Sequence, residues 1–550
     1  MRLPSSIRSQ VDPAAITKVT RLFNNTLGDI LIELVQNARR AGASLIDLAT
    51  AEIEGATWIT VSDDGAGIQD PCVILSLGRS GWEETLAARE DPAGMGVFSL
   101  AGRYVEVRSR SRGASQGWRV EITPEAWESG EPMAVTPCDH GLGTSFRLEL
   151  DAVSAKSIEQ TARSVASYCP VPIRFNGTLL PQRDWLAGAE AVIEQDGVRI
   201  GLFRDARAVR QTGRINFHGV VVACSLPTVS EQDRHWWVKI DIVDAPELQL
   251  VLPARKEMVE NSALGDLRQS VIRAIYRRIQ SLGEHRLPYK CWCEARDLGV
   301  DLPEARQLLD PWYPSQADCN GGSARNERKL GANPILVCDL GPPIEQCADF
   351  AVAQDDRFAT RLAQPVPAME GYSWYDALER ITDMRFEIEK DGEIRRFDAT
   401  ELPAVTSGVV DRLDLVVELA GPEAETIVIP APVAILYDDS IVWDFEEAAI
   451  VLASPDAVSP PELVELLEGA CFCSSDDREA DSWDTQNSRF LLDAREVAMR
   501  LLFGDDAAII ERLRAILADR VQWFVPEERQ FTAVIARNAL DIQIGPSKAG

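Results

Sequence analysis

Residues 24–43 read NNTLGDILIELVQNARRAGA, and this stretch decides the fold of the N-terminal part of the chain. Its apolar residues recur at steps of three and four, which predicts a helix with one buried face: Leu27, Ile30, Leu31, Leu34, Val35 and Ala38. Gly42 is placed to end this helix. Glu33 and Asn37 are four residues apart, so the helix brings their side chains to one face. A carboxylate that can take a proton from water, beside an amide oxygen that suits Mg²⁺, indicates a site for water and a divalent metal.

Such a pair also arises by chance on amphipathic helices, but three glycine-containing stretches follow it. An alternating apolar run ends in Asp63-Asp64-Gly65-Ala66-Gly67, which places a carboxylate at a sharp turn. Gly94-Met95-Gly96 precedes a short apolar run, where glycines let backbone N–H groups approach phosphates. Gly141-Leu142-Gly143-Thr144-Ser145 leads into a predicted strand over residues 146–150. A plain turn explains each cluster alone, but it does not explain all four elements in this order.

The order ELVQNA, DDGAG, GMGVFS and GLGTS, within residues 15–150, resembles the N, G1, G2 and G3 boxes of the GHKL ATPases. That superfamily contains DNA gyrase, the Hsp90 chaperones, sensor histidine kinases and MutL mismatch-repair proteins. The resemblance implies a Bergerat-type α/β sandwich over residues 1–152, with ATP and Mg²⁺ as cofactors. The fold class expected for the chain is α+β.

The resemblance also implies a role for each matching residue. Glu33 matches the general base that activates water, Asn37 matches the Mg²⁺ ligand, and Asp63 matches the carboxylate that accepts the adenine amino group. The remaining matches would line the nucleotide pocket: Gly65, Gly67, Gly94, Gly96 and Thr144. Residues 69–93 would form the lid over ATP, in which Arg79, Ser80 and Gly81 are similar to the Lys-Ser-Gly of Hsp90-type lids.

One position departs from the family pattern. Arg40 stands where the family commonly has an Asp, as in Asn-Ala-x-Asp-Ala. This puts the hydrogen bonding around the adenine-side water in doubt, but it leaves the base and the Mg²⁺ ligand in place.

Residues 153–285 predict a second, small α+β domain, and the resemblance implies that it is of the transducer type. Short alternating strands over VPIRFNG, GVRIGLF, RINFHGVVVAC and HWWVKIDIV are followed by a helix with Leu267, Val271, Ile272, Ile275 and Ile279 at helical spacing. LVLPARKEMVEN, residues 250–261, is similar to the Hsp90 middle-domain stretch that carries a phosphate-reaching arginine. Lys256 falls at that arginine and Arg255 precedes it. A cation there would stabilise charge on the phosphoryl oxygens, whereas a surface pair at a helix start is the simpler interpretation of these two residues alone.

The 550 residues carry 56 basic and 86 acidic side chains. The acidic excess lies in the second half, because residues 1–290 sum to −3 and residues 291–550 to −27. Phosphates repel such a surface, so nucleic acid is an unlikely partner of the acidic half, which suits solubility or a basic partner. A local basic run could contact DNA, but it is more typical of a solvated strand edge and loop: Arg103, Arg108, Arg110, Arg112 and Arg119.

Residues 286–550 carry no further family signal. We expect a β-rich part over about 371–455 and a helical part over about 461–525. The Cys291/Cys293 and Cys471/Cys473 pairs are spaced too tightly for a typical zinc site, so core cysteines are the favoured interpretation. All four histidines follow the first three boxes, which disfavours a histidine kinase. No apolar run is long enough to cross a membrane and no signal sequence is evident, so we expect a cytoplasmic protein.

The function expected from these features is a slow ATPase that works as a nucleotide-driven conformational switch, Hsp90-like or MORC-like. The resemblance implies a nucleotide-dependent homodimer, and the C-terminal half would recognise a protein client or partner. The alternative is a binding module that senses the nucleotide without significant turnover.

Overall fold

The computed structural model describes residues 26–76, 96–129, 132–150, 155–206, 214–251, 257–318, 327–353, 355–398, 400–421, 424–437, 448–475, 477 and 480–546. The chain divides into two compact units, Met1–Arg306 and Gln307–Gly550. Both units combine mixed sheets with helices, which confirms the predicted α+β class.

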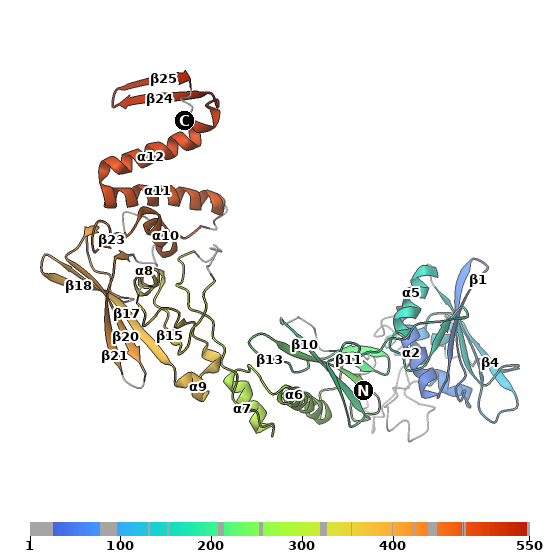
Figure 1. The fold of residues 1–550 in the computed structure, drawn as a ribbon. Coiled ribbons are helices and arrows are strands. Elements are labelled where there is room, and N and C mark those ends of the chain that lie inside the picture. Colours follow the sequence, from blue (N-terminus) through green and yellow to red (C-terminus); the bar gives the residue numbers. More distant parts are fainter. Residues whose placement is uncertain are drawn as a thin grey trace, which may run out of the picture. The chain divides into compact units, whose positions relative to one another are not determined.

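The first body of the N-terminal unit is built on an eight-stranded sheet (Figure 1). Its order is β5-β4-β3-β6-β2-β1-β7-β8, and β1 and β7 pair in parallel while the other neighbours are antiparallel. The strands are β1 Ile46–Ile53, β2 Ala56–Asp63, β3 Val105–Arg110, β4 Gly117–Ile122, β5 Thr136–Cys138, β6 Gly143–Leu150, β7 Ile173–Phe175 and β8 Thr178–Leu179.

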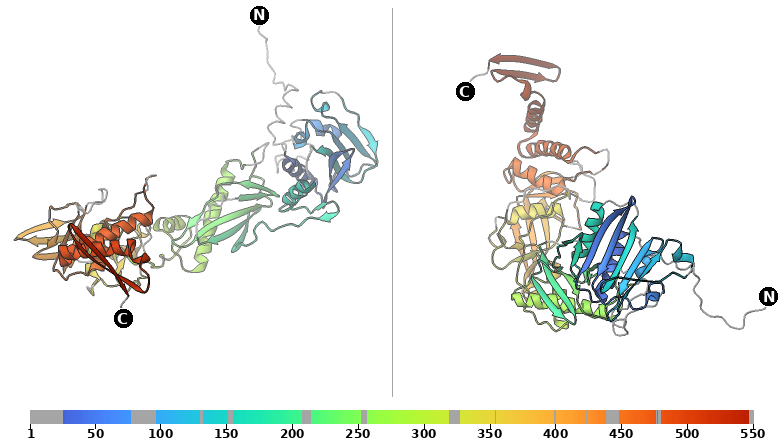
Figure 2. Two further views of the ribbon diagram at one scale, coloured as in Figure 1. Left: turned by 90° about the horizontal axis from the view of Figure 1, so that it is seen from above. Right: turned by 90° about the vertical axis from the view of Figure 1, so that its right-hand side faces the viewer.

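Helices α2 (Leu27–Arg40) and α5 (Ala155–Ala166) lie side by side on one face of this sheet (Figures 1 and 2). Thr26 caps α2 because its hydroxyl accepts a hydrogen bond from the Asp29 N–H at 3.2 Å, and Gly42, with φ +68°, follows its end. The apolar stripe predicted for this helix is buried in the core, except for the partly buried Leu27. Shorter helical elements complete the body: η1 Pro71–Leu75, η2 Gly96–Leu100 and α4 Ala126–Ser129.

The second body of the N-terminal unit is a smaller sheet covered by a long helix. Its order is β12-β11-β14-β10-β9, with β13 paired to β14. The elements are β9 Ala191–Gln195, β10 Val198–Asp205, β11 Arg214–Phe217, β12 Val220–Ala223, β13 Val229–Ser230, β14 His235–Ile242, α6 Ser262–Leu282 and α7 Tyr289–Asp297. Of the five apolar positions predicted for α6, Leu267, Val271, Ile275 and Ile279 are buried and Ile272 is partly buried.

The first body extends past residue 152, where the sequence predicts a boundary. Helix α5 and strands β7 and β8 belong to it, and its core runs as far as Leu180. The core of the second body begins at Val198 and ends at Leu302. Strands β7 and β8 belong to the first sheet because β7 pairs with β1. This pairing joins residues more than a hundred positions apart, so local periodicity in the sequence cannot predict it. The division into residues 1–152, 153–285 and 286–550 stays a prediction.

The C-terminal unit has a larger and a smaller sheet around one core. The larger is ordered β16-β15-β17-β20-β21 with β18 on β17, and the smaller is ordered β19-β23-β22. Their strands are β15 Ile335–Val337, β16 Leu362–Ala363, β17 Glu379–Lys390, β18 Glu393–Phe397, β19 Gly408–Val409, β20 Arg412–Ala420, β21 Glu425–Pro430, β22 Val433–Leu436 and β23 Ala449–Leu452.

Helices accompany these sheets and a hairpin ends the unit. The helical elements are α8 Pro342–Val352, η3 Pro367–Met369, α9 Ser373–Asp376, α10 Pro460–Cys471, α11 Trp483–Phe503, α12 Asp505–Arg520 and η4 Gln522–Phe524. Strands and helices thus occupy the stretches predicted as β-rich and helical. The final hairpin, β24 (Arg529–Ala536) and β25 (Ala539–Pro546), was not predicted from the sequence.

Candidate functional site

Helix α2 carries the first two predicted site residues. Glu33 is buried with 8% of its surface exposed, and Asn37, one turn further along, is partly buried. The 3.6-residue period places both on one side of the helix. Asn37 presents a hard oxygen donor of the kind that Mg²⁺ accepts, and Mg²⁺ usually takes only one or two protein ligands beside substrate phosphates. The residues present therefore fit a magnesium–nucleotide ligand.

Asp63 ends strand β2 and lies at the C-terminal end of α2. The loop after it is bonded to the helix end, because the Ala66 N–H donates to the Ala41 carbonyl at 2.9 Å. Burial raises the pKa of Asp63 to about 6, although backbone N–H groups of Gly65 and Thr144 act in the opposite direction. The neighbouring Asp64 has a structural role. Its carboxylate accepts hydrogen bonds from the backbone N–H groups of Ser44 and Leu45. A buried carboxylate with a raised pKa is typical of a functional site.

Thr144 stands beside Asp63 across the sheet. Strands β2 and β6 pair in the register Asp63↔Thr144. The Thr144 hydroxyl is buried and lies 3.0 Å from the hydroxyl of Ser109 on β3. Ser109 was missed by sequence reasoning; it also donates to the Gly143 carbonyl and accepts from the Ile68 N–H. This serine therefore ties the DDGAG loop to the start of β6.

Two glycines of the predicted boxes are required by close backbone approaches. Gly67 has φ +69°, and a Cβ there would lie 2.1 Å from the Arg110 carbonyl oxygen. Gly143 has φ +110°, and a Cβ there would lie 1.9 Å from the Asp63 carbonyl oxygen. Only glycine fits either place. Both glycines therefore hold the backbone close around the end of β2.

The other predicted site residues are only partly covered by the structure. Gly96 begins η2, which packs against α2. Arg79, Ser80, Gly81 and Gly94 lie outside the described residues, as does most of the predicted lid. Arg255 and Lys256 also lie outside them. Their described flanks are bonded to each other, since the Val251 N–H donates to the Glu257 carbonyl at 2.9 Å.

Arg40 contacts the predicted magnesium ligand. Its guanidinium donates to the Asn37 amide oxygen at 3.3 Å. This is the oxygen that would bind the metal, so the positive charge of Arg40 lies beside the proposed metal position and would oppose a cation there. The usual Asp at this position could not donate such a bond.

Gln36 connects the same helix to the second body, a link that the sequence did not indicate. Its buried amide donates to the backbone carbonyl of His218 at 2.8 Å. His218 lies in the turn between β11 and β12, and the Gly219 N–H is held by the Asn216 side chain at 2.9 Å. The helix that carries Glu33 and Asn37 is thereby hydrogen-bonded to the second body.

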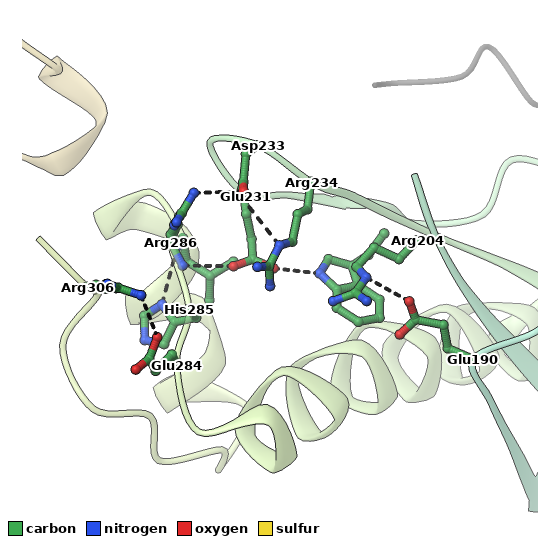
Figure 3. Close-up of polar contacts among 11 residues, drawn as sticks. Glu190, Arg204, Glu231, Asp233, Arg234, Glu284, His285, Arg286 and Arg306 are labelled. Atoms are coloured by element: carbon green, nitrogen blue, oxygen red, sulfur yellow. Dashed lines mark hydrogen bonds and ion pairs between the residues drawn. The ribbon is translucent and has the colours of Figure 1, made fainter. Parts of the chain in front are cut away.

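A separate cluster of polar side chains lies in the second body, where the segment after α6 meets the turn before β14 (Figure 3). Glu231 accepts hydrogen bonds from the Trp236 indole and the Arg286 N–H, both at 2.8 Å, and Arg286 pairs with Asp233 at 2.7 Å. The buried His285 bonds through Nε2 to the Pro303 carbonyl at 2.7 Å, and burial lowers its pKa. These bonds hold the segment after α6 on the sheet, which gives the cluster a structural role.

Elsewhere we looked in the described residues for a metal cluster, a free basic surface and a membrane-spanning helix. They contain no group of three or more His, Cys, Asp and Glu side chains arranged to hold a metal ion. In the basic run, Arg108 and Arg119 form ion pairs with Glu106. Within the described parts of the chain, no helix combines the length and hydropathy needed to cross a membrane.

Comparison with known proteins finds a sequence relative for part of this chain. No protein-family model matches the chain. Over 221 residues, 39% of this chain, the sequence is 26% identical to the DNA mismatch repair protein MutL of Gemmatimonas aurantiaca. The match covers 31% of that protein, so the chain spans about a third of the length of the curated relative it matches.

A solved structure of the ATPase domain from the bacterial mismatch repair endonuclease MutL of Aquifex aeolicus aligns with 35% of this chain and 76% of that chain. The identity is 16% and the TM-score 0.23. The sequence match to a MutL protein confirms the resemblance to the GHKL ATPases that the motifs predicted.

Proposed function

We propose that this chain, whose N-terminal part resembles the GHKL ATPases, binds ATP with Mg²⁺ and hydrolyses it slowly as a conformational switch in the cytoplasm. One observation carries the proposal. Motif residues from three distant stretches meet at one end of the first sheet, where Asp63 and Thr144 are direct cross-strand partners and the loop after Asp63 is bonded to the end of α2. A buried carboxylate with a raised pKa and two positions that only glycine fits lie there, on the side of the helix end that follows Asn37.

The proposed roles follow from the chemistry of each group. Asp63 accepts a hydrogen bond from the adenine amino group, with Thr144, Gly65 and Gly67 shaping the pocket around it. Asn37 supplies one oxygen to Mg²⁺, whose charge offsets that of the phosphates. Glu33 takes a proton from the attacking water. Gly94 and Gly96 would lie under the phosphates, and Arg79, Ser80 and Gly81 would belong to the lid.

We propose that the lid and the second body close over the γ-phosphate when ATP is bound. Lys256, or Arg255 beside it, would then stabilise charge on the phosphoryl oxygens. Closure would pair two N-terminal domains, giving a nucleotide-dependent homodimer, and the energy would go into the change of shape. The proposed assignment to the Hsp90-like or MORC-like branch, in preference to a DNA-topology enzyme, is based on residues 250–261 and on the acidic C-terminal half.

We propose that the partner of the C-terminal half is a protein, not yet identified. The net charge of −27 over residues 291–550 disfavours a surface for nucleic acid. The MutL relative is named for DNA mismatch repair, which is a property of that protein.

The alternative is a nucleotide sensor that holds ATP without turnover. It is favoured by the hydrogen bond from Arg40 to the Asn37 oxygen, because a cation at that oxygen opposes the metal. The presence of Glu33 in a buried position favours the enzyme instead.

Phosphate release from ATP and Mg²⁺ by the wild type and the Glu33→Ala variant separates the two. Loss of the general base should lower turnover about 100-fold or more while ATP still binds. Glu149→Gln, an exposed residue on β6, is the matched control and should leave turnover unchanged. No turnover in the wild type despite bound ATP would favour the sensor.

A further inference from the structure

A cavity opens between α6 and the sheet of the second body, and none of its lining residues belongs to the candidate nucleotide site. Its volume is about 390 Å³. Part of its lining is apolar, because it includes Val198 and Ile200 of β10 together with Leu248 and Leu267. All four side chains are buried in the core of this body, where α6 packs on the sheet (Figure 1). The volume lies within the range of small-molecule sites.

The loop that lines one side of this cavity is held in place by hydrogen bonds. At its start, the Asp244 N–H donates to the Gly197 carbonyl at 2.8 Å. At its end, the Asn261 amide donates to the Glu247 carbonyl at 3.0 Å, while the Asn261 side-chain oxygen caps α6 by accepting from the Leu264 N–H at 3.0 Å. The cavity is therefore formed before any ligand arrives, which lowers the cost of ordering it on binding.

Three exposed acidic residues line the same cavity from three separate segments. Asp196 lies in the turn between β9 and β10, Glu247 in the loop after β14, and Asp266 on α6. The lining that the structure describes contains no Lys, Arg or His. The Asp196 carboxylate accepts a hydrogen bond from the Gln195 amide at 2.8 Å. The described residues give the carboxylates of Glu247 and Asp266 no hydrogen bond or ion pair, so the cavity favours a cation.

The spacing of the carboxylates disfavours a metal ion as this cation. In the described parts of the chain, no three His, Cys, Asp or Glu side chains are close enough together to hold one. The space is also elongated, since Asp266 and Ser270 line both this cavity and a neighbouring hollow of about 480 Å³ along α6. Separate negative charges around an apolar lining suit a ligand whose positive charges are separated by hydrocarbon.

We propose that this cavity binds a linear aliphatic polyamine. Its hydrocarbon chain would lie on the buried apolar lining, and its ammonium groups would pair with Asp196, Glu247 and Asp266. Acidic residues alone would be an ordinary solvated surface, whereas the apolar lining removes the hydrocarbon from water. Three carboxylates would repel an anion, so the cavity is not a second nucleotide site. The proposal is independent of ATP binding and goes beyond the proposed function.

The test is a calorimetric titration of the full-length chain, without nucleotide, with spermidine at about 0.15 M salt, which screens weak contacts at the exposed acidic surface. The wild type should show a saturable site. Asp266→Asn removes one carboxylate and should weaken binding at this site about tenfold or more, because a charged hydrogen-bond acceptor is lost. Asp297→Asn removes the same charge from an exposed position on α7 outside the cavity, so it is the matched control and should bind as the wild type does.

Two further measurements separate the cavity from a general attraction of cations to this acidic chain. Ala263→Leu places a larger side chain in the lining without changing the charge, and it should weaken spermidine binding because the cavity is partly filled. Hexaamminecobalt(III) is a compact trivalent cation without hydrocarbon. It should not displace spermidine from the cavity, whereas it would displace spermidine that is attracted by charge alone.

Four outcomes would overturn the inference. These are a wild type without a saturable site, an Asp266→Asn chain that binds as tightly as the wild type, an equal loss of affinity in Asp297→Asn, and displacement by the cobalt complex at equal concentration. Undiminished binding by Ala263→Leu would overturn the apolar part of the site and with it the choice of ligand. Glu33→Ala should bind spermidine as the wild type does, so this proposal and the proposed ATPase activity fail separately.

Discussion

Asp63, the proposed acceptor of the adenine amino group, has a pKa that burial raises. Its carboxylate is buried at the end of β2, and its pKa is raised from 3.8 to about 6 because burial disfavours the charged form. The group is therefore ionised at neutral pH and becomes protonated as the pH falls through about 6. An ionised acceptor binds an amino group more strongly than a neutral one.

The affinity for ATP should consequently be constant above pH 7 and weaken as the pH falls through about 6. Asp63→Asn should bind ATP on the order of 10- to 100-fold more weakly and show little of this pH dependence, since a hydrogen bond to a charged group contributes about 1.5–3 kcal/mol. Calorimetric titration of both proteins across this pH range measures the effect, and their difference removes protonation of the nucleotide itself. Normal ATP binding by the Asn variant would contradict the assignment of the pocket.

Helix α2 is the element on which the proposed site depends. It carries Glu33 and Asn37, and through Gln36 it is bonded to the turn between β11 and β12 in the second body. If ATP binds as proposed, this partly buried hydrogen bond would link the nucleotide site to the second body. A hydrogen bond of this kind contributes about 0.5–1.5 kcal/mol.

Gln36→Leu should therefore lower turnover about tenfold while changing the ATP dissociation constant much less, because the second body loses a hydrogen bond to the helix that carries Glu33 and Asn37. Phosphate release and nucleotide titration measure the two quantities. Val221→Thr, an exposed residue on β12, is the control for the same hairpin. Equal losses of binding and turnover would instead indicate that α2 itself is disturbed.

The whole molecule joins a nearly neutral N-terminal half to a strongly acidic C-terminal half. The proposed nucleotide-dependent pairing joins two N-terminal halves, in which the charge is small enough not to oppose it.

Turnover per chain should rise with protein concentration, because pairing of the N-terminal domains requires two chains to meet. Phosphate release at several protein concentrations measures this. A turnover per chain that stays the same at every concentration would contradict the proposed ATP-driven pairing of free chains.

Much of the fold was predictable because the spacing of apolar residues along the chain indicates where helices and strands form. The helical period in residues 24–43 predicted α2, alternating apolar residues predicted β10 and β14, and short β-type runs predicted a β-rich part over about 371–455. The boxes assigned Asp63 and Thr144 to one site, and the two are cross-strand neighbours. The roles assigned to Glu33, Asn37 and the other site residues remain predictions.

The sequence by itself determined the α+β class, the N-terminal resemblance and the candidate site, because each depends on residues that are near one another in the chain or on motifs in a fixed order. Only the tertiary structure decided that β7 and β8 belong to the first sheet, that Ser109 supports Thr144, and that Gln36 reaches the second body. These contacts join residues far apart in sequence.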